Sequence, residues 1–289
     1  MIQSPSVLIT GTSSGIGRAA AVHMKNLGWR VFACARKAED LDELSAAGFE
    51  AVEMDMSLSA SIESAAEKVL RLCDQQLDGL VNNAGYGQPG ALEDLSPEAM
   101  RRQFEVNVVG LQHLTNCVLP CMIQRGSGRI VHVSSVVGRI ALPFMGIYSA
   151  SKFAVEAMAD AQRVELRGTG VKLSLIEPGP IETRFSKNAL THTGHDFSDR
   201  DSRFSALYAR ELNRRAQRSE PKPFSLPPEA VARKIAHALT SRHPRRRYPV
   251  TLPAHLGAWM RRLSPDALLE WILSAELKKR SPGEESSSP

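Results

Sequence analysis

Residues 7–17 read Val-Leu-Ile-Thr-Gly-Thr-Ser-Ser-Gly-Ile-Gly, an apolar run that passes directly into a glycine-rich turn. The segment 18–27 that follows has the composition and spacing of a helix. Gly11 permits a tight turn, Gly15 lets the backbone approach a pyrophosphate, and Gly17 lets the helix pack closely on the strand. Backbone N–H groups at the helix N-terminus favour an anion there. This stretch therefore predicts a strand, a phosphate-binding turn and a helix.

The rest of the chain continues the alternation of apolar strands and amphipathic helices. Strands are expected at 7–10, 30–35, 51–54, 78–82, 129–135, 171–176 and 248–252, and helices at 18–27, 59–73, 97–125, 150–167, 229–241 and 254–279. This order predicts an α/β fold in three layers, a doubly wound parallel sheet of seven strands with right-handed crossovers and helices on both faces. Ligands bind beyond the carboxyl ends of such strands, where several polar or glycine residues follow: Gly11, Arg36, Asp55, Asn83, Ser135 and Gly179.

The end of the second strand indicates which dinucleotide the turn would hold. Residues 34–37 contain no acidic side chain for a ribose 2′-hydroxyl, and Arg36 and Lys37 stand there instead. Cations at this place would pair with a 2′-phosphate, with Ser13 assisting. The pattern favours NADP(H) over NAD(H). The alternative is that Arg36 is an ordinary solvated charge at a strand end.

A second motif, Tyr148-Ser-Ala-Ser-Lys152, places a phenol and an ammonium on the same face of a helix. An ammonium beside a phenolate lowers the pKa of the tyrosine, which would make Tyr148 a general acid/base near neutral pH. Ser135 precedes this motif, directly after a strand-like run, and is placed to hydrogen-bond the reacting oxygen. A Tyr-x-x-x-Lys pair alone is common on helix surfaces. The catalytic interpretation of this pair therefore depends on the glycine-rich turn upstream.

Three further segments carry expectations. Asn107 lies among apolar residues of its helix and, by that pattern, is a satisfied core residue. The small residues at 83–85 indicate close backbone approach, either to a cofactor or within a packed loop. Residues 182–228 break the periodicity and are expected to form a helical lid over the substrate pocket, the alternative being a surface excursion. Its aromatic residues are Phe185, Phe197, Phe204 and Tyr208.

The C-terminal segment is basic and amphipathic. Residues 254–280 are expected to form a helical extension that packs on the protein, with contact to a membrane surface as the less favoured alternative. Residues 281–289 are expected to be a disordered tail.

Composition narrows the class of protein. The chain has 289 residues, of which 43% are hydrophobic, as suits a single catalytic domain over residues 1–280. It has no apolar run of about 20 residues and no recognisable targeting segment, so a cytoplasmic location is expected. The four cysteines are too scattered for a metal site and are expected to be reduced. The net charge of +5 comes without a nucleic-acid-binding motif, so no nucleic-acid partner is expected.

Together these residues resemble the short-chain dehydrogenase/reductase family over residues 5–252. The family's Thr-Gly-x-x-x-Gly-x-Gly motif matches 10–17, and its Asn-Asn-Ala-Gly motif matches 82–85. The resemblance implies a Rossmann-type fold and the catalytic residues Asn107, Ser135, Tyr148 and Lys152. It reverses the interpretation of Asn107, which would anchor a water that links the lysine to solvent. It also implies a set of cofactor-binding residues: Gly11, Ser13, Ser14, Gly15, Ile16, Gly17, Arg36, Lys37, Asp55, Met56, Asn83, Ala84, Gly85, Tyr148, Lys152, Pro178, Gly179, Ile181 and Thr183.

The runs 142–144, 177–185 and 247–252 resemble the branch of 17-beta-hydroxysteroid and retinol dehydrogenases and bacterial NADP-dependent aldehyde reductases. This implies reversible NADPH-dependent reduction of a hydrophobic aldehyde or ketone, in an apolar pocket formed by lid aromatics and by Tyr86, Leu142, Phe144 and Met145. Steroid or retinoid oxidation is the alternative reaction, and a non-catalytic NADP-sensing protein is the alternative class. Members usually form homodimers or homotetramers, through helices that here would be 98–125 and 148–167.

Overall fold

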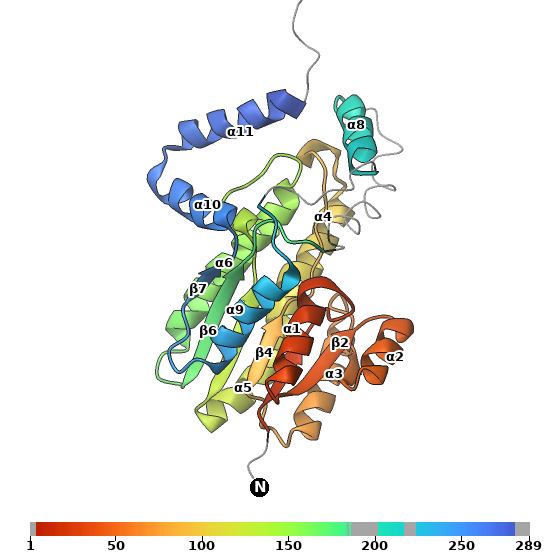
Figure 1. Cartoon of the computed structure of the whole chain (residues 1–289), viewed down its shortest axis with the longest axis vertical. Helices are drawn as coiled ribbons and strands as arrows, with labels where there is room; N and C mark the ends of the chain where they lie inside the picture. The colour runs from red at the N-terminus through yellow and green to blue at the C-terminus, as the bar shows by residue number, and fades with distance from the viewer. Residues whose placement is uncertain (1–3, 184, 186–201, 217–223, 281–289) are drawn as a thin grey trace, which may run out of the picture.

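The computed structural model describes residues 4–183, 185, 202–216 and 224–280. Its centre is a seven-stranded parallel sheet in the order β3-β2-β1-β4-β5-β6-β7 (Figure 1). The strands are β1 (Ser6–Ile9), β2 (Arg30–Ala35), β3 (Glu50–Glu53), β4 (Gly79–Asn82), β5 (Gly128–Val133), β6 (Val171–Glu177) and β7 (Arg247–Pro249). The chain reverses its direction of winding between β1 and β4, so the carboxyl ends of these strands form the crevice where a ligand binds. The predicted doubly wound sheet is confirmed.

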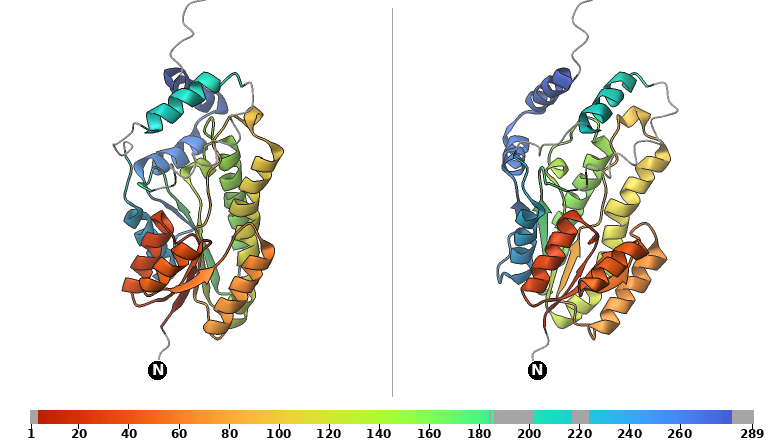
Figure 2. Two further views of the ribbon diagram at one scale, coloured as in Figure 1. Left: turned by 90° about the vertical axis from the view of Figure 1, so that its right-hand side faces the viewer. Right: turned by 45° about the vertical axis from the view of Figure 1, so that its right-hand side comes forward.

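Helices cover both faces of the sheet (Figure 2). One face packs against α1 (Gly15–Asn26), α2 (Ala38–Ala46) and α9 (Pro228–Thr240). The other packs against α3 (Ser59–Leu72), α5 (Leu111–Arg125) and α6 (Gly146–Glu165). Strands buried on both faces need apolar side chains at successive positions, which explains the unbroken apolar runs. Leu8 and Ile9 accordingly point into opposite cores, and both are fully buried.

The helix predicted at 97–125 is divided into three parts. It consists of α4 (Pro97–Phe104), a π-helical turn η2 (Glu105–Gly110) and α5. π turns are rare and mostly occur at functional sites. This one carries Asn107, and its last residue, Gly110, lies so close to the carbonyl of Met56 that a Cβ would be 2.1 Å from that oxygen. The helix as a whole is long and apolar enough to cross a membrane, but 44% of its apolar window is buried within the protein.

Other boundaries also differ from the predicted ones. Helix α6 begins at Gly146, four residues earlier than expected, so Tyr148 lies in its first turn. The extension predicted as one helix is two, α10 (Leu252–Leu263) and α11 (Asp266–Arg280). Ser264 between them is extended because a residue before proline disfavours the helical conformation. Helix α2 was not predicted from the sequence.

The predicted lid contains a helix, α8 (Ser205–Ala216), above the carboxyl edge of the sheet (Figure 1). Phe197 and the tail 281–289 lie outside the described residues. The extension begins on the core, where Ala254 is 2% exposed, but its two tryptophans, Trp259 and Trp271, are 63% and 69% exposed.

Candidate active site

The glycine turn after β1 has the geometry that the sequence predicts. Gly11 has a φ of +69°, and a Cβ there would lie 2.9 Å from the Cα of Ala84. A Cβ on Gly17 would lie 2.1 Å from the carbonyl oxygen of Gly11. Both positions therefore exclude any side chain, and only glycine allows the backbone segments of the turn to approach one another this closely.

The segment after β4 holds this turn in place. The Thr10 hydroxyl accepts hydrogen bonds from the backbone N–H groups of Asn83 and Ala84, at 3.0 and 2.9 Å. The Asn83 amide in turn donates to the carbonyl oxygens of Thr10 and Gly11, at 2.9 and 3.1 Å. The Asn83 side chain is thus used to shape the turn, and close backbone approach explains the small residues beside it.

These features fit a dinucleotide pyrophosphate. Ser14 precedes α1 in an extended conformation, and within the described residues its side chain makes no capping hydrogen bond. The first turn of α1 also contains no acidic residue, so its N–H groups and the helix dipole favour an anion. Ile16 lies in that first turn, and Ser13 is exposed beside it.

The predicted 2′-phosphate site lies at the ends of β2 and β3. The Arg36 side chain is 67% exposed and lies 3.8 Å from the Asp55 carboxylate, a loose surface pair. Asp55 is also bonded to Ser57, whose hydroxyl donates to it at 2.6 Å. Lys37 is exposed directly before α2. The guanidinium is therefore free to move toward a bound phosphate at low cost. Met56, by contrast, is buried in the core.

The residues predicted to hold the nicotinamide end follow β6. Thr183 lies against the glycine turn, since a Cβ on Gly15 would be 3.1 Å from its methyl group. Gly179 faces Thr251, whose hydroxyl would be 2.1 Å from a Cβ at that position. Pro178 accepts a hydrogen bond from Val136 at 2.8 Å, and Ile181 pairs with Leu226. The two ends of the predicted cofactor site therefore meet along one edge of the sheet.

Tyr148, Ser135 and Lys152 come together at this edge. Tyr148 is 8% exposed, and the ring of Phe185 lies on it with 5.5 Å between centroids. Burial raises the pKa of Tyr148 to about 12, and a hydrogen bond with Ser135 opposes that rise. The Ser135 hydroxyl also accepts from the backbone N–H of Val137. The expectation of a near-neutral tyrosine is therefore wrong for this structure, and the phenol keeps its proton.

The position of Lys152 explains this difference. Its ammonium donates to the carbonyl oxygen of Val133 at 2.8 Å and lies 5.9 Å from the centroid of the Tyr148 ring. Burial lowers the pKa of Lys152 to about 8, and the Glu156 carboxylate opposes that change. The sequence correctly predicts that the two side chains share a face, but spacing alone does not include the loss of hydration on burial.

Asn107 is fully buried beside Lys152. Its amide oxygen accepts from the backbone N–H of Tyr86 at 3.1 Å, and its nitrogen donates to the Tyr86 carbonyl at 2.9 Å and to the Ser151 hydroxyl at 3.2 Å. A Cβ on Gly85 would lie 2.9 Å from the Asn107 oxygen and 3.8 Å from the lysine nitrogen. Asn107 therefore fixes the loop that borders Lys152, and its water-anchoring role stays a prediction.

Apolar side chains surround the phenol. A Cβ on Gly87 would be 3.0 Å from the ring of Phe185 and 3.3 Å from the methyl of Met145, so these groups meet beside Tyr148. Leu142 is 38% exposed nearby in sequence. Phe144 turns toward the lid, where its ring lies 5.1 Å from that of Phe204. Of the predicted substrate residues, Met145 thus lies beside the phenol and Phe144 faces the lid, while a substrate role for Leu142 and Tyr86 stays a prediction.

A buried ionic network behind α6 was not predicted. Glu156, one turn after Lys152, is 5% exposed and accepts from Arg247 at 2.9 Å. Arg247 also donates to Glu177 at 3.1 Å, and Arg139 donates to Glu177 at 3.2 Å. Periodicity does not detect such a network, because its members come from four separate elements. It connects β7 to the helix that carries Tyr148 and Lys152.

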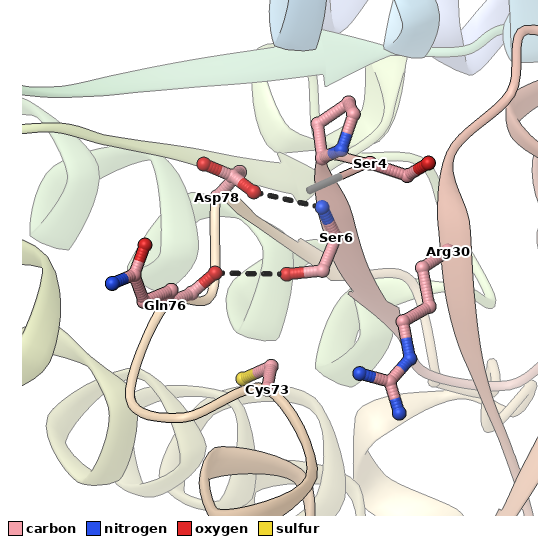
Figure 3. Close-up of a pocket in the computed structure, with 7 residues that line it drawn as sticks. Ser4, Ser6, Arg30, Cys73, Gln76 and Asp78 are labelled. Carbon is pink, nitrogen blue, oxygen red and sulfur yellow. Dashed lines mark hydrogen bonds between the residues drawn. The ribbon is translucent and has the colours of Figure 1, made fainter. Parts of the chain in front are cut away.

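A separate shallow pocket lies at the opposite, amino-terminal edge of the sheet (Figure 3). Ser6 there donates to Asp78 at 2.7 Å and to the carbonyl of Gln76 at 3.0 Å. Burial raises the pKa of the Cys73 thiol, which makes it a poor nucleophile. The Cys73 thiol donates to the carbonyl of Leu70, and Ser6 is bonded to both Gln76 and Asp78. The described residues contain no cluster of three or more potential metal ligands.

Comparison with known proteins agrees with this geometry. A family model described as short chain dehydrogenase matches residues 5–194. The uncharacterized oxidoreductase YbbO of Escherichia coli K12 is 42% identical, with 94% of this chain and 95% of YbbO covered. The NADPH-dependent 3-dehydrocapnine reductase of Ornithobacterium rhinotracheale is 34% identical, and the match covers 94% of this chain and 97% of the reductase. The 17-beta-hydroxysteroid dehydrogenase type 6 of Rattus norvegicus is 36% identical, and the match covers 94% of this chain and 89% of the dehydrogenase.

Solved structures share the whole architecture. A short chain dehydrogenase/reductase from Burkholderia phymatum in complex with NAD has a TM-score of 0.74 and 29% identity, with 99% of each chain covered. A short chain dehydrogenase from Burkholderia cenocepacia J2315 in complex with NADP has a TM-score of 0.73 and 25% identity, covering 94% of this chain and 99% of the other. With the glycine turn, the Tyr148–Lys152 pair and these matches, the chain belongs to the short-chain dehydrogenase family of oxidoreductases.

Proposed function

We propose that this chain reduces a hydrophobic aldehyde or ketone to the alcohol with NADPH, in a reversible reaction. The observation that carries the proposal is the meeting of Tyr148, Ser135 and Lys152 at the carboxyl edge of the sheet, the edge that also carries the glycine turn. A bound nicotinamide cofactor supplies the hydride, so the chain itself must supply orientation and a proton.

Tyr148 is suited to give that proton. Its raised pKa, about 12, keeps the phenol protonated at physiological pH, so it can donate to the oxygen of a carbonyl substrate. The Ser135 hydroxyl, which lowers the pKa of the phenol against the effect of burial, is placed to orient the same oxygen. The charged Lys152 lies near the ring and stabilises negative charge that develops on the tyrosine oxygen.

The preference for NADP(H) rests on Arg36. Its exposed guanidinium lies at the end of β2, where an NAD-binding chain carries a carboxylate. A planar guanidinium binds phosphate through two parallel hydrogen bonds, which suits a 2′-phosphate. The NADPH dependence stated for the 3-dehydrocapnine reductase supports the same preference.

The apolar surroundings of the phenol support a hydrophobic substrate. Phe185 and Met145 lie beside Tyr148, and Phe144 and the lid aromatics continue the apolar surface. The same surface suits a steroid or retinoid alcohol, and the similarity to a 17-beta-hydroxysteroid dehydrogenase keeps this as the second candidate. A non-catalytic NADP-sensing protein is less favoured because the complete set of catalytic side chains is present.

We also propose that the chain forms a homo-oligomer through α5 and α6. These helices expose large apolar side chains that the sheet does not cover: Ile123, Phe153 and Val164. Large apolar side chains left exposed on both helices support an interface between copies of the chain. Sedimentation velocity tests this proposal, and a monomer at micromolar concentration would refute it.

The test of the function is NADPH oxidation with a panel of aliphatic and aromatic aldehydes, ketones, steroids and retinal, with NADH in parallel. Turnover on hydrophobic aldehydes with NADPH is the expected result. Activity confined to steroids or retinoids would favour the second candidate. Tight NADPH binding without turnover on any carbonyl would contradict the proposal.

A further inference from the structure

Among the described residues, the lid helix α8 forms side-chain hydrogen bonds with the body at the 3-10 turn η1 (Leu92–Asp94). Asp94 is 5% exposed, and its carboxylate accepts hydrogen bonds from the Ser202 hydroxyl at 2.7 Å and from the Tyr208 hydroxyl at 2.5 Å. The Tyr208 oxygen in turn accepts from the backbone N–H of Ala91 at 2.8 Å. A buried carboxylate thus bonds side chains on both sides of the start of α8.

A second contact between the η1 turn and the lid segment is exposed to solvent, whereas the Asp94 carboxylate is buried. Glu93 and Arg203 form a bidentate ion pair at 2.8 and 3.0 Å, with side chains that are 49% and 72% exposed. Exposed pairs contribute little because water screens them, whereas a hydrogen bond to a buried carboxylate is strong. Of the two neighbouring acidic residues, Asp94 is therefore the one that holds the helix.

Three aromatic rings fill the space next to this attachment. Phe144 packs edge-to-face on Phe204 and on Tyr208, with centroids 5.1 and 5.9 Å apart. Phe144 has a φ of +59°, a strained backbone conformation that such a residue adopts only where its surroundings hold it. Its carbonyl oxygen accepts from the N–H of Gly90 at 2.8 Å, which joins it to the η1 loop.

The attachment is continuous with the catalytic site. Phe144 and Met145 directly precede α6, which carries Tyr148 in its first turn. Gly90 pairs with Met145, and a Cβ on Gly146 would lie 2.9 Å from Leu92 of η1. The loop to which α8 is bonded therefore packs against the start of the helix that carries the reacting phenol.

We propose that Asp94 is a positioning and specificity-determining residue: it fastens α8 so that Phe144, Phe204 and Tyr208 form the distal wall of the substrate site. This wall favours carbonyl substrates with an extended apolar group, such as a long alkyl chain, over short ones. The part that concerns substrates rests on the function proposed above. The part that concerns the fastening of α8 does not.

The test compares Asp94→Asn and Tyr208→Phe with the matched control Glu93→Gln in the full chain. Hydrogen–deuterium exchange of peptides from Ser205–Ala216 measures the fastening without any substrate. We expect exchange there to rise about tenfold or more in the first two variants, since each weakens a hydrogen bond to a buried carboxylate. The control should match the wild type, and peptides from β5 should be unchanged in all three.

Equal exchange in Asp94→Asn, Tyr208→Phe and Glu93→Gln would overturn the fastening role. The substrate role is measured as kcat/KM for decanal relative to propanal, with NADPH. We expect that ratio to fall about tenfold in Asp94→Asn while the Kd for NADPH is unchanged. An unchanged ratio with loosened α8 would overturn the specificity role. If the wild type reduces no carbonyl compound, the proposed function fails, and the exchange experiment still decides whether Asp94 fastens α8.

Discussion

Replacing Lys152 with methionine should make the protein more stable at neutral pH while removing its activity. Burial lowers the pKa of Lys152 from 10.5 to about 8. At 1.36 kcal/mol per pKa unit, this difference of about 2.5 corresponds to about 3.4 kcal/mol by which charge burial opposes folding below pH 8. The methionine side chain has a similar length and carries no charge, so this cost is absent from the variant.

The change of this stability difference with pH tests the charge of Lys152 most specifically. Between the folded and unfolded pKa values of Lys152, the unfolded chain binds more protons than the folded one, so the wild type gains stability as the pH rises. The variant has no proton to lose there. The difference in unfolding free energy between variant and wild type should therefore decrease by about 2.5 kcal/mol from pH 7 to pH 10. Urea unfolding followed by circular dichroism measures it.

The matched control is Lys68→Met, because Lys68 is exposed on α3. Loss of the hydrogen bond from Lys152 to Val133 changes the size of the difference at every pH but not its slope. A stability difference between Lys152→Met and wild type that does not change with pH would refute the conclusion that a buried, charged Lys152 opposes folding.

Other predictions follow from the same site. In Arg36→Asp, the Kd for NADPH should rise about a hundredfold and that for NADH should change little, because only NADPH has a 2′-phosphate; equal weakening would exclude that role. The rate of carbonyl reduction should fall as the pH rises through about 8, where Lys152 loses its charge; a flat profile to pH 10 would contradict this. Arg247→Met leaves the Glu156 and Glu177 carboxylates buried without this partner and should cost about 3–5 kcal/mol of stability by urea unfolding; a loss below about 1 kcal/mol would show that the network tolerates its removal.

The sequence contains enough information for the sheet and for the cofactor turn. No other residue fits at Gly11 or Gly17, because a Cβ at either position meets backbone atoms. The glycine pattern that meets this constraint can be recognised in the sequence. The strands follow from apolar runs that both faces of the sheet require. Tyr148, Lys152 and Ser135 were predicted from their spacing and chemistry, whereas a catalytic role for Asn107 comes from the family resemblance alone and stays a prediction.

The sequence does not predict how deeply the charged side chains are buried or which groups surround them. The pKa of Tyr148 depends on burial and on where the Lys152 ammonium points, and neither follows from a spacing of four residues. Asp94 stands in a short acidic loop with no periodic signal, and its partners are more than a hundred positions away in sequence. The π turn at Asn107 likewise depends on contacts with Tyr86 and Met56 that only the folded chain brings together.

The measurement that tests the central claim most directly compares wild type and Tyr148→Phe for NADPH binding and for NADPH oxidation with a hydrophobic aldehyde. The phenylalanine ring preserves the packing against Phe185 and removes only the hydroxyl. We predict an unchanged Kd for NADPH and a loss of turnover of about a hundredfold to ten-thousandfold. Near-native turnover in Tyr148→Phe would show that another group gives the proton and would contradict the account.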